Sequence, residues 1–270
     1  MKQFILSKEP DFSQGGGIVR LTGNDYHYLV NVRRLATGEF FPALLPNGSE
    51  TLVQVLSVEH GVLTGKCVSA ENTAQERENS LPPIILFQAL PKGDKMDLIV
   101  RQAAEGGITE IVPFVSEFSV AKTAAAKGQK FSRWERIIKE ARQQSGSKIA
   151  TNLHQPLTAN EVFIYWKKLQ ENNEANPLGL LFHHQRGLEQ KCLHEYLYSI
   201  PSVVALAIGP EGGFSGKEVS LFLENGFKPL TIGDTVFRTE TAALYCAAAI
   251  RILLLEKDSW ELKQAKSGRE

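Results

Sequence analysis

The sequence predicts an α/β protein in which a mainly parallel sheet follows a smaller β-rich domain. From residue 84 onward, apolar runs alternate with helical patterns, as in βαβ units. Residues 1–73 instead contain short apolar or alternating segments separated by turns, which favours a small all-β, barrel-like domain. A polar segment that ends in two prolines predicts a linker over residues 74–83.

The elements of the α/β part, residues 84–270, follow in chain order. Strands are expected at 84–90, 108–115, 178–182, 203–208 and 228–232. Helices are expected at 94–105, 132–144 and 242–255, and the second of these has its apolar residues at helical spacing. Two more helices begin at capping boxes, in which Thr158 pairs with Glu161 and Ser215 pairs with Glu218. Gly226 ends the second of these.

Composition limits the classes of protein. The chain has 270 residues, and its 30 basic and 30 acidic side chains cancel, so any affinity for nucleic acid must come from a local patch. Three scattered cysteines fit neither a disulfide framework nor a zinc site, which indicates a reducing compartment. The N-terminus lacks the apolar core of a signal peptide, and the C-terminal apolar run is interrupted by Arg251. We therefore expect a cytoplasmic protein without a bound metal.

Two segments near the C-terminus carry most of the functional information. Residues 208–215 and 232–242 each follow a predicted strand and precede a predicted helix, so both lie at the sheet edge where ligands bind in α/β folds. A tight turn explains the glycines of the first segment as well as a ligand does. A phosphate-binding P-loop is excluded because Glu211 and Glu218 occupy its required glycine and hydroxyl positions.

Arg238 in the second segment requires a separate explanation. Thr239 or Thr241 is a suitable helix N-cap, and Glu240 is favourable near the positive end of a helix. A cation at that end is electrostatically misplaced, so Arg238 is expected to have an anionic partner, such as Glu211 or a phosphate.

Both segments resemble the signatures of one enzyme family. Residues 209–218 read GPEGGFSGKE and residues 232–242 read IGDTVFRTETA. Further blocks occur in the family's order along essentially the whole chain, at 32–38, 102–107, 111–120 and 144–146. By these motifs the chain is similar to the RsmE-type 16S ribosomal RNA (uridine-N3) methyltransferases of the SPOUT, or trefoil-knot, class.

The resemblance implies a fold and a cofactor. It implies an N-terminal PUA-like β-barrel that helps to bind RNA, and a SPOUT domain whose parallel sheet contains a deep trefoil knot, a rare topology. It also implies a homodimer that binds S-adenosyl-L-methionine and acts on small-subunit ribosomal RNA, within the assembled 30S subunit. Matching positions place these residues around the methyl donor: Leu181, Phe182, Ile208, Gly209, Pro210, Glu211, Gly212, Gly213, Ile232, Gly233, Val236, Phe237, Thr239, Thr241 and Ala242.

The acceptor chemistry points to two candidate catalytic residues, Arg238 and Glu211. A uracil N3 proton must leave before or during methyl transfer, and the Arg238 cation is placed to stabilise the developing anion. Glu211 either accepts that proton or anchors its loop, so the sequence does not assign the base. Phe118 and Gln143 stand where many relatives have charged residues on the side that the resemblance places toward RNA.

A local basic excess marks the predicted RNA contact. Residues 122–148 contain eight basic and two acidic side chains. We expect the basic side chains of the 132–144 helix to share the face opposite its apolar residues, where a solvated helix face is the alternative to phosphate contact. The candidate RNA-binding residues are Arg33, Arg34, Arg133, Arg136, Arg142 and Lys148.

Two other functions fit the same sequence. One is a methyltransferase of this class that acts on another RNA position. The other is a non-catalytic RNA-binding or ribosome assembly factor that retains the fold.

Overall fold

The structure is a computed structural model that describes residues 4–11, 17–68, 81–120, 128–172, 176–184, 188–231 and 233–267. The chain divides into two compact units, Met1–Glu78 with Arg142–Ala150, and Asn79–Ala141 with Thr151–Glu270. Residues 74–80 of the predicted linker lie outside the described residues.

The first unit is built on a five-stranded sheet. Its strands, in the spatial order β1-β3-β4-β5-β2, are β1 (Phe4–Ile5), β3 (Phe40–Leu44), β4 (Glu50–Glu59), β5 (Val62–Val68) and β2 (Ile18–Leu21). All the pairs are antiparallel except β1 with β3. Buried apolar side chains such as Phe41, Val53 and Leu63 form the core on one side of this sheet.

The expectation of an all-β unit is wrong for one segment. Residues 23–32 form α1 (Gly23–Tyr26), which continues as a π-helical turn, η1 (His27–Val32). Leu29 anchors this segment in the core of the unit. Thr22, with Asp25 in the first turn, is a helix-start signal that the sequence did contain, since an acidic side chain there is favourable.

The second unit contains a parallel sheet. Its strands are β6 (Ile84–Ala89), β7 (Glu110–Val115), β8 (Asn152–Leu153), β9 (Leu157–Thr158), β10 (Leu178–Phe182), β11 (Val204–Ile208) and β12 (Lys228–Leu230). Their order is β12-β10-β11-β6-β7-β8, with β9 also paired to β7. Every pair is parallel, which confirms the predicted α/β class.

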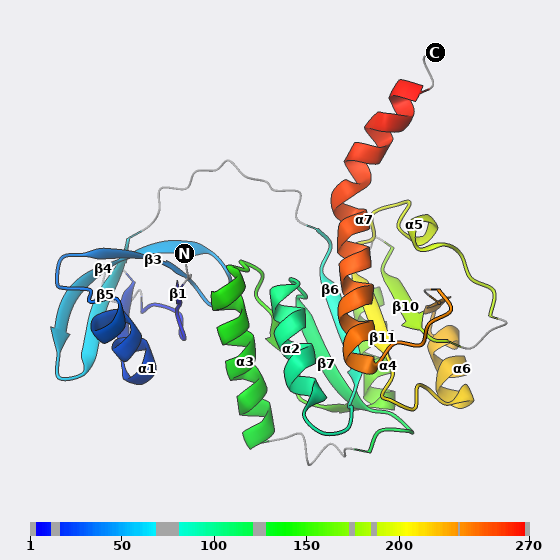
Figure 1. Cartoon of the computed structure of the whole chain (residues 1–270), viewed down its shortest axis with the longest axis horizontal. Helices are drawn as coiled ribbons and strands as arrows, with labels where there is room; N and C mark the ends of the chain where they lie inside the picture. The colour runs from blue at the N-terminus through cyan, green and yellow to red at the C-terminus, as the bar shows by residue number, and fades with distance from the viewer. Residues whose placement is uncertain are drawn as a thin grey trace. The chain divides into compact units, whose positions relative to one another are not determined.

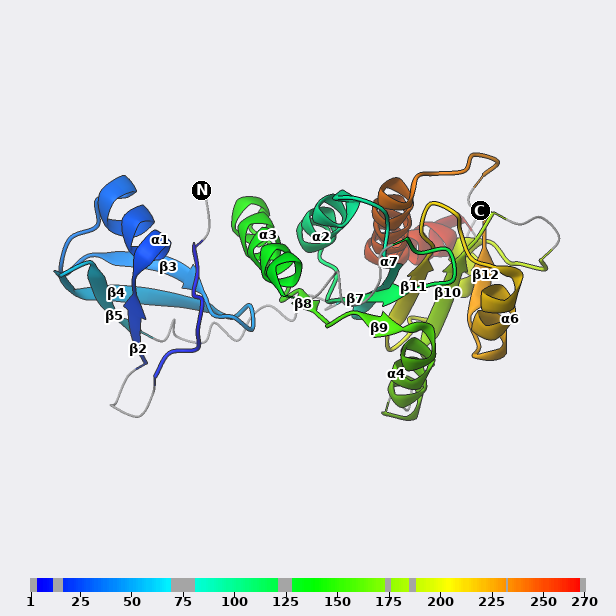
Figure 2. The same ribbon diagram turned by 90° about the horizontal axis from the view of Figure 1, so that it is seen from below.

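Helices cover both faces of this sheet. They are α2 (Lys95–Glu105), α3 (Gln129–Ser145), α4 (Ala159–Asn172), α5 (Leu193–Tyr196), α6 (Gly216–Glu224) and α7 (Thr239–Ser267). Successive strand residues point to opposite faces, so Leu86 and Leu206 pack with α2 and α7, whereas Phe87 and Ala205 pack with α4 and α6. Figures 1 and 2 show these two helical layers.

Local sequence signals set the helix boundaries. The capping boxes at Thr158 and Ser215 are present, with reciprocal backbone and side-chain hydrogen bonds to Glu161 and Glu218. The last helix was expected at 242–255 but begins at Thr239. The Ala242 N–H donates to the Arg238 carbonyl, so Arg238 holds the N-cap position that was expected for a threonine.

Replacing Glu218 with glutamine is expected to destabilise the protein by about 1–3 kcal/mol. The buried Glu218 carboxylate accepts hydrogen bonds from the backbone N–H groups of Ser215 and Glu117, at 2.9 and 2.8 Å. An amide turns one of these acceptors into a donor that faces another donor. Urea unfolding measures the loss. Glu161→Gln, in the exposed capping box of α4, is the matched control, and an equal loss there would contradict a special role for burial.

Candidate functional site

A pocket of about 310 Å³ lies at the carboxyl edge of the parallel sheet in the second unit. Phe182, Ile208 and Leu230, the last residues of β10, β11 and β12, form its floor. Adjacent parallel strands end at the same edge, which is where α/β proteins bind ligands. The two segments singled out in the sequence form walls of this one pocket.

The structure brings most of the predicted donor-site residues to this pocket. Those that line it are Phe182, Ile208, Gly209, Pro210, Glu211, Gly213, Val236, Phe237, Thr239 and Ala242. Leu181 is buried on the α4 and α6 face, and Gly212, Gly233 and Thr241 lie outside the lining. Ile232 lies outside the described residues.

Backbone packing explains two glycines of the first wall. A Cβ on Gly209 would lie 3.0 Å from the backbone C and Cα of Gly213. Gly213 has φ of +69° and donates its N–H to the Pro210 carbonyl at 2.9 Å. The turn therefore closes on itself through backbone contacts, and glycine permits both the approach and the left-handed conformation.

The segment after β7 supports this wall from outside. A Cβ on Gly212 would lie 3.1 Å from Cβ of Phe118, so the phenyl group packs against the turn. The preceding residue, Glu117, is fixed by its backbone hydrogen bond to Glu218 at the start of α6. Phe118, which departs from the family pattern, thus contacts the glycine-rich wall.

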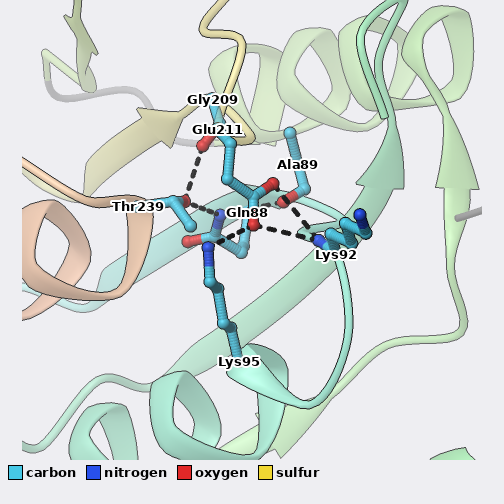
Figure 3. A network of polar contacts seen from close by, with 7 residues as sticks. All are labelled: Gln88, Ala89, Lys92, Lys95, Gly209, Glu211 and Thr239. Carbon is cyan, nitrogen blue, oxygen red and sulfur yellow. Dashed lines mark hydrogen bonds and ion pairs between the residues drawn. The ribbon is translucent and has the colours of Figure 1, made fainter. Parts of the chain in front are cut away.

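Glu211 anchors the same wall to the segment after β6. Its carboxylate accepts a hydrogen bond from the Lys95 ammonium at 2.5 Å, and both of its oxygens lie 3.2 Å from the Lys92 backbone nitrogen (Figure 3). Burial tends to raise the pKa of Glu211, but these hydrogen bonds outweigh it and hold that pKa below its ordinary value. A carboxylate with a lowered pKa is a weak proton acceptor, so the geometry favours the anchoring role.

Arg238 lines the second wall and is exposed. Of the two partners considered for it, Glu211 is engaged by Lys95 instead. Within the described part of the chain, no ion pair is found for Arg238. Its guanidinium is therefore available to an anionic group that enters the pocket.

Sequence reasoning missed several residues of the site. Thr231, Thr235, His184 and Cys246 line the pocket. Gln88 and Lys95, which support its walls, were missed as well. Gln88 left a signal, because it is the one polar residue in the apolar strand IILFQA.

The candidate RNA-binding residues have different surroundings. Arg33 is half-buried, and Arg34 is exposed with φ of +59°. Exposed Arg133 and Arg136 pair with Asp97 and Glu140. Lys148 is exposed and pairs with Glu50 at 3.0 Å.

The expectation that Arg142 lies on the exposed face of α3 is wrong. This side chain is 6% exposed, and burial lowers the pKa of its guanidinium. Arg142 follows buried Ile138 by one helical turn, so the two lie on the same side of the helix. Its contact with RNA stays a prediction.

Three further features of the described residues concern membrane, metal and disulfide sites. None of their helices is long and apolar enough to cross a membrane. Across the same residues, no group of three or more histidine, cysteine or acidic side chains is arranged to hold a metal ion. Cys67, Cys192 and Cys246 are free thiols.

Known proteins share both the sequence and the fold. A family model described as an RNA methyltransferase domain matches residues 77–251. The ribosomal RNA small subunit methyltransferase E of Synechocystis is 33% identical over 239 residues, which cover 87% of this chain and 73% of that protein. The chain belongs to the RsmE family. The Bacillus subtilis member is 28% identical over 249 residues and 91% of each chain.

Solved structures share the fold of this RsmE family member. A methyltransferase candidate from Legionella pneumophila, solved with the cofactor SAM bound, is 28% identical with a TM-score of 0.73 and covers 93% of this chain and 98% of its own. The Neisseria gonorrhoeae RsmE protein, at 24% identity and a TM-score of 0.72, covers 94% of this chain and 98% of its own and shows the same fold.

Replacing Glu211 with glutamine in this RsmE family member is expected to lower kcat less than about tenfold, since the amide keeps one acceptor for the Lys95 ammonium. If Glu211 were instead the base, its replacement would lower kcat by about 10²-fold or more and would alter the pH profile of kcat. Lys95→Met serves as the companion variant, because it removes the contact with Glu211 and keeps the carboxylate. If Glu211 is an anchor, Lys95→Met should lower kcat at least as much as Glu211→Gln does. Kinetics from pH 6 to 9 distinguish the two roles.

The lowered pKa of Glu211 also predicts a pH dependence of stability. A carboxyl group whose folded-state pKa lies below its ordinary value of 4.5 stabilises the fold fully above about pH 4.5 and loses this contribution as the pH falls through the folded-state pKa. The difference in unfolding midpoint between wild type and Glu211→Gln should therefore shrink below about pH 4.5. A constant difference down to about pH 3 would contradict the ion pair.

Proposed function

We propose that the protein transfers a methyl group from S-adenosyl-L-methionine to N3 of a uridine in 16S ribosomal RNA of the small subunit. The similarity over 87% of the chain to a ribosomal RNA small subunit methyltransferase E carries this proposal. The pocket supports it, because the two segments that carry the family's signatures line one cavity. The bound SAM in the 28% identical Legionella protein supports the choice of cofactor.

The lining of the pocket fits this donor. Backbone amides and carbonyls of the glycine-rich turn suit an adenine edge, which needs hydrogen-bonding groups without charged side chains. Apolar side chains of Phe182, Ile208 and Val236 supply van der Waals surface. S-adenosylmethionine would supply the electrophilic methyl group, and the residues around it bind and orient it.

The acceptor chemistry is assigned to Arg238. A bond forms between the methyl carbon and uracil N3, the bond from that carbon to sulfur breaks, and the N3 proton leaves to a base. Negative charge develops on the uracil as the proton leaves, and a fixed guanidinium stabilises it most in a site that excludes water. Glu211 holds the glycine-rich wall in place through Lys95.

The domain roles follow from the same assignment. We assign RNA binding to residues 1–73, as a PUA-like barrel, and catalysis to residues 84–270, as a trefoil-knotted SPOUT domain joined through linker 74–83. A cytoplasmic homodimer that acts on the assembled 30S subunit completes the proposal. An apolar pocket of about 220 Å³ between α2 and α7, lined by partly exposed Leu244, Ile252 and Leu255, supports self-association.

Transfer from labelled S-adenosylmethionine tests the proposal. Small subunits from a strain that lacks the gene should accept label, and nucleoside mass spectrometry should find N3-methyluridine. Label at another nucleoside favours the related enzyme on a different position. RNA binding without binding of S-adenosylhomocysteine favours the assembly factor. Naked 16S RNA, assayed in parallel, identifies the physical form of the substrate.

Replacing Arg133, Arg136 and Lys139 with glutamine is expected to weaken RNA binding and to reduce the slope of log Kd against log salt by about two. Each lost phosphate contact removes about 0.7–0.9 from that slope. Filter binding at several salt concentrations provides the measurement. Lys167, Lys168 and Lys217, which are exposed on α4 and α6, form a charge-matched control triple. An equal change in the control would indicate an effect of total charge alone.

A further inference from the structure

We propose that Gln88 is a positioning residue of the methyl-donor pocket and acts through Thr239. This inference rests on the proposed function. Gln88 lies on β6, is 0% exposed and does not line the pocket. Its side-chain nitrogen lies 3.0 Å from the Thr239 hydroxyl, which lies 2.6 Å from the Gly209 carbonyl oxygen. In Figure 3, dashed lines join Thr239 to both Gln88 and Gly209.

The backbone carbonyls beside Gln88 and at Gly209 determine the direction of each hydrogen bond in this series. The carbonyls of Ala89 and Gly209 only accept hydrogen bonds. Gln88 therefore presents its amide nitrogen to the Ala89 carbonyl, at 2.9 Å, and uses its second N–H for the Thr239 hydroxyl. That hydroxyl in turn must donate to Gly209. The order of donation is Gln88 to Thr239 to Gly209.

This series of hydrogen bonds joins three segments that are distant in the sequence. Gln88 and Thr239 are 151 residues apart, and Thr239 and Gly209 are 30 apart. Gly209 begins the glycine-rich wall and Thr239 begins α7 in the other wall, so one hydroxyl connects both walls of the pocket. Because Gln88 fixes the hydroxyl's orientation, it controls the spacing of two walls that it does not itself form.

The side-chain oxygen of Gln88 indicates whether this residue serves ligand binding or only the stability of the fold. Among the described residues, no hydrogen-bond donor reaches its buried Oε1 atom. A buried acceptor without a partner destabilises a fold, and an apolar side chain of similar size avoids that penalty. A glutamine selected only for stability is therefore unexpected in this strand, whereas a glutamine selected for its N–H donors is expected.

Calorimetry with S-adenosylhomocysteine tests the role of these hydrogen bonds in binding. Thr239→Val, which keeps the shape and removes the hydroxyl, should raise the Kd about tenfold, and Thr239→Ser should restore it to within about twofold. Gln88→Leu should raise the Kd several-fold without lowering the unfolding midpoint. The double variant should bind no worse than Thr239→Val, because groups in one network are not additive.

Thr151→Val is the matched control. Its hydroxyl is also buried and also donates to a backbone carbonyl, that of Ile108 at 2.7 Å, but it lies outside the pocket lining. This variant should lower the unfolding midpoint and leave the Kd unchanged. A rise in Kd as large as that of Thr239→Val would overturn the inference.

Gln88→Glu supplies a readout that a purely structural side chain would not give. An ionised carboxylate only accepts hydrogen bonds, so the Thr239 hydroxyl would turn toward it and release Gly209. Burial raises the pKa of such a carboxyl group toward neutrality. The Kd of this variant, relative to wild type, should therefore rise by about threefold or more between pH 6 and pH 9. A constant ratio would count against the proposed direction of donation.

The two proposals fail in different ways. If wild-type protein does not bind S-adenosylhomocysteine, the donor site itself is wrong. If wild type binds and Thr239→Val binds equally well, only the positioning role of Gln88 and Thr239 is overturned.

Discussion

Replacing Arg238 with alanine is expected to lower kcat for methyl transfer by about 10²- to 10³-fold, the range found when one group that stabilises developing charge is removed. The Kd for S-adenosylhomocysteine should stay within about twofold of wild type. Arg238 is exposed at the pocket, no ion pair is found for it in the described part of the chain, and it occupies the N-cap position of α7. Its cation has no structural purpose there, so its contribution should be confined to the reaction.

Single-turnover rates with saturating donor, together with calorimetry, separate the two effects. Arg238→Lys should recover part of the rate, because an ammonium keeps the charge but loses the planar guanidinium. Lys217→Ala, which removes an exposed cation from α6 beyond the glycine-rich wall, should leave the rate unchanged. If Arg238→Ala weakens donor binding as much as it lowers kcat, the arginine is part of the pocket's structure.

Most of the α/β architecture could be predicted because its signals are local. The apolar run at 178–182 coincides with β10, and the capping boxes at Thr158 and Ser215 identify the starts of α4 and α6. The convergence of two loops on one pocket follows from parallel strands alone, since their carboxyl ends meet at one edge. These predictions needed no knowledge of which side chains touch.

The unpredicted features depend on contacts between distant segments. Lys95 meets Glu211 across 116 residues, so the sequence offered Arg238 as an equally reasonable partner. The start of α7 depends on Thr239, whose hydroxyl bonds to Gly209 and so does not cap the helix. The wrong prediction of an exposed Arg142 has a different origin, because its spacing of four residues from Ile138 already indicated the buried side of the helix.

Replacing Gly209 with alanine is expected to raise the Kd for S-adenosylhomocysteine by at least about tenfold, a loss of about 1.4 kcal/mol, because backbone atoms of the binding turn must shift by a few tenths of an ångström. The added methyl group would lie 3.0 Å from backbone atoms of Gly213. Backbone cannot rotate away as a flexible side chain can, so the glycine-rich turn must open. Opening displaces the Gly209 carbonyl from the Thr239 hydroxyl, which lies 2.6 Å away, and separates the two walls of the pocket.

Gly216→Ala is the matched control for this substitution. Gly216 begins α6 only seven residues after Gly209, yet beyond its chain neighbours and its own helix backbone no atom lies within 4 Å of the position that its Cβ would take, and its φ is not positive. Alanine has a higher helix propensity than glycine by about 1 kcal/mol, so this variant should be as stable as wild type or more stable, with an unchanged Kd. If both variants bind S-adenosylhomocysteine like wild type, the close approach of Gly209 to Gly213 has no part in shaping the site. Loss of binding in Gly209→Ala alone, with an unfolding midpoint near that of wild type, would locate the defect in the geometry of the turn.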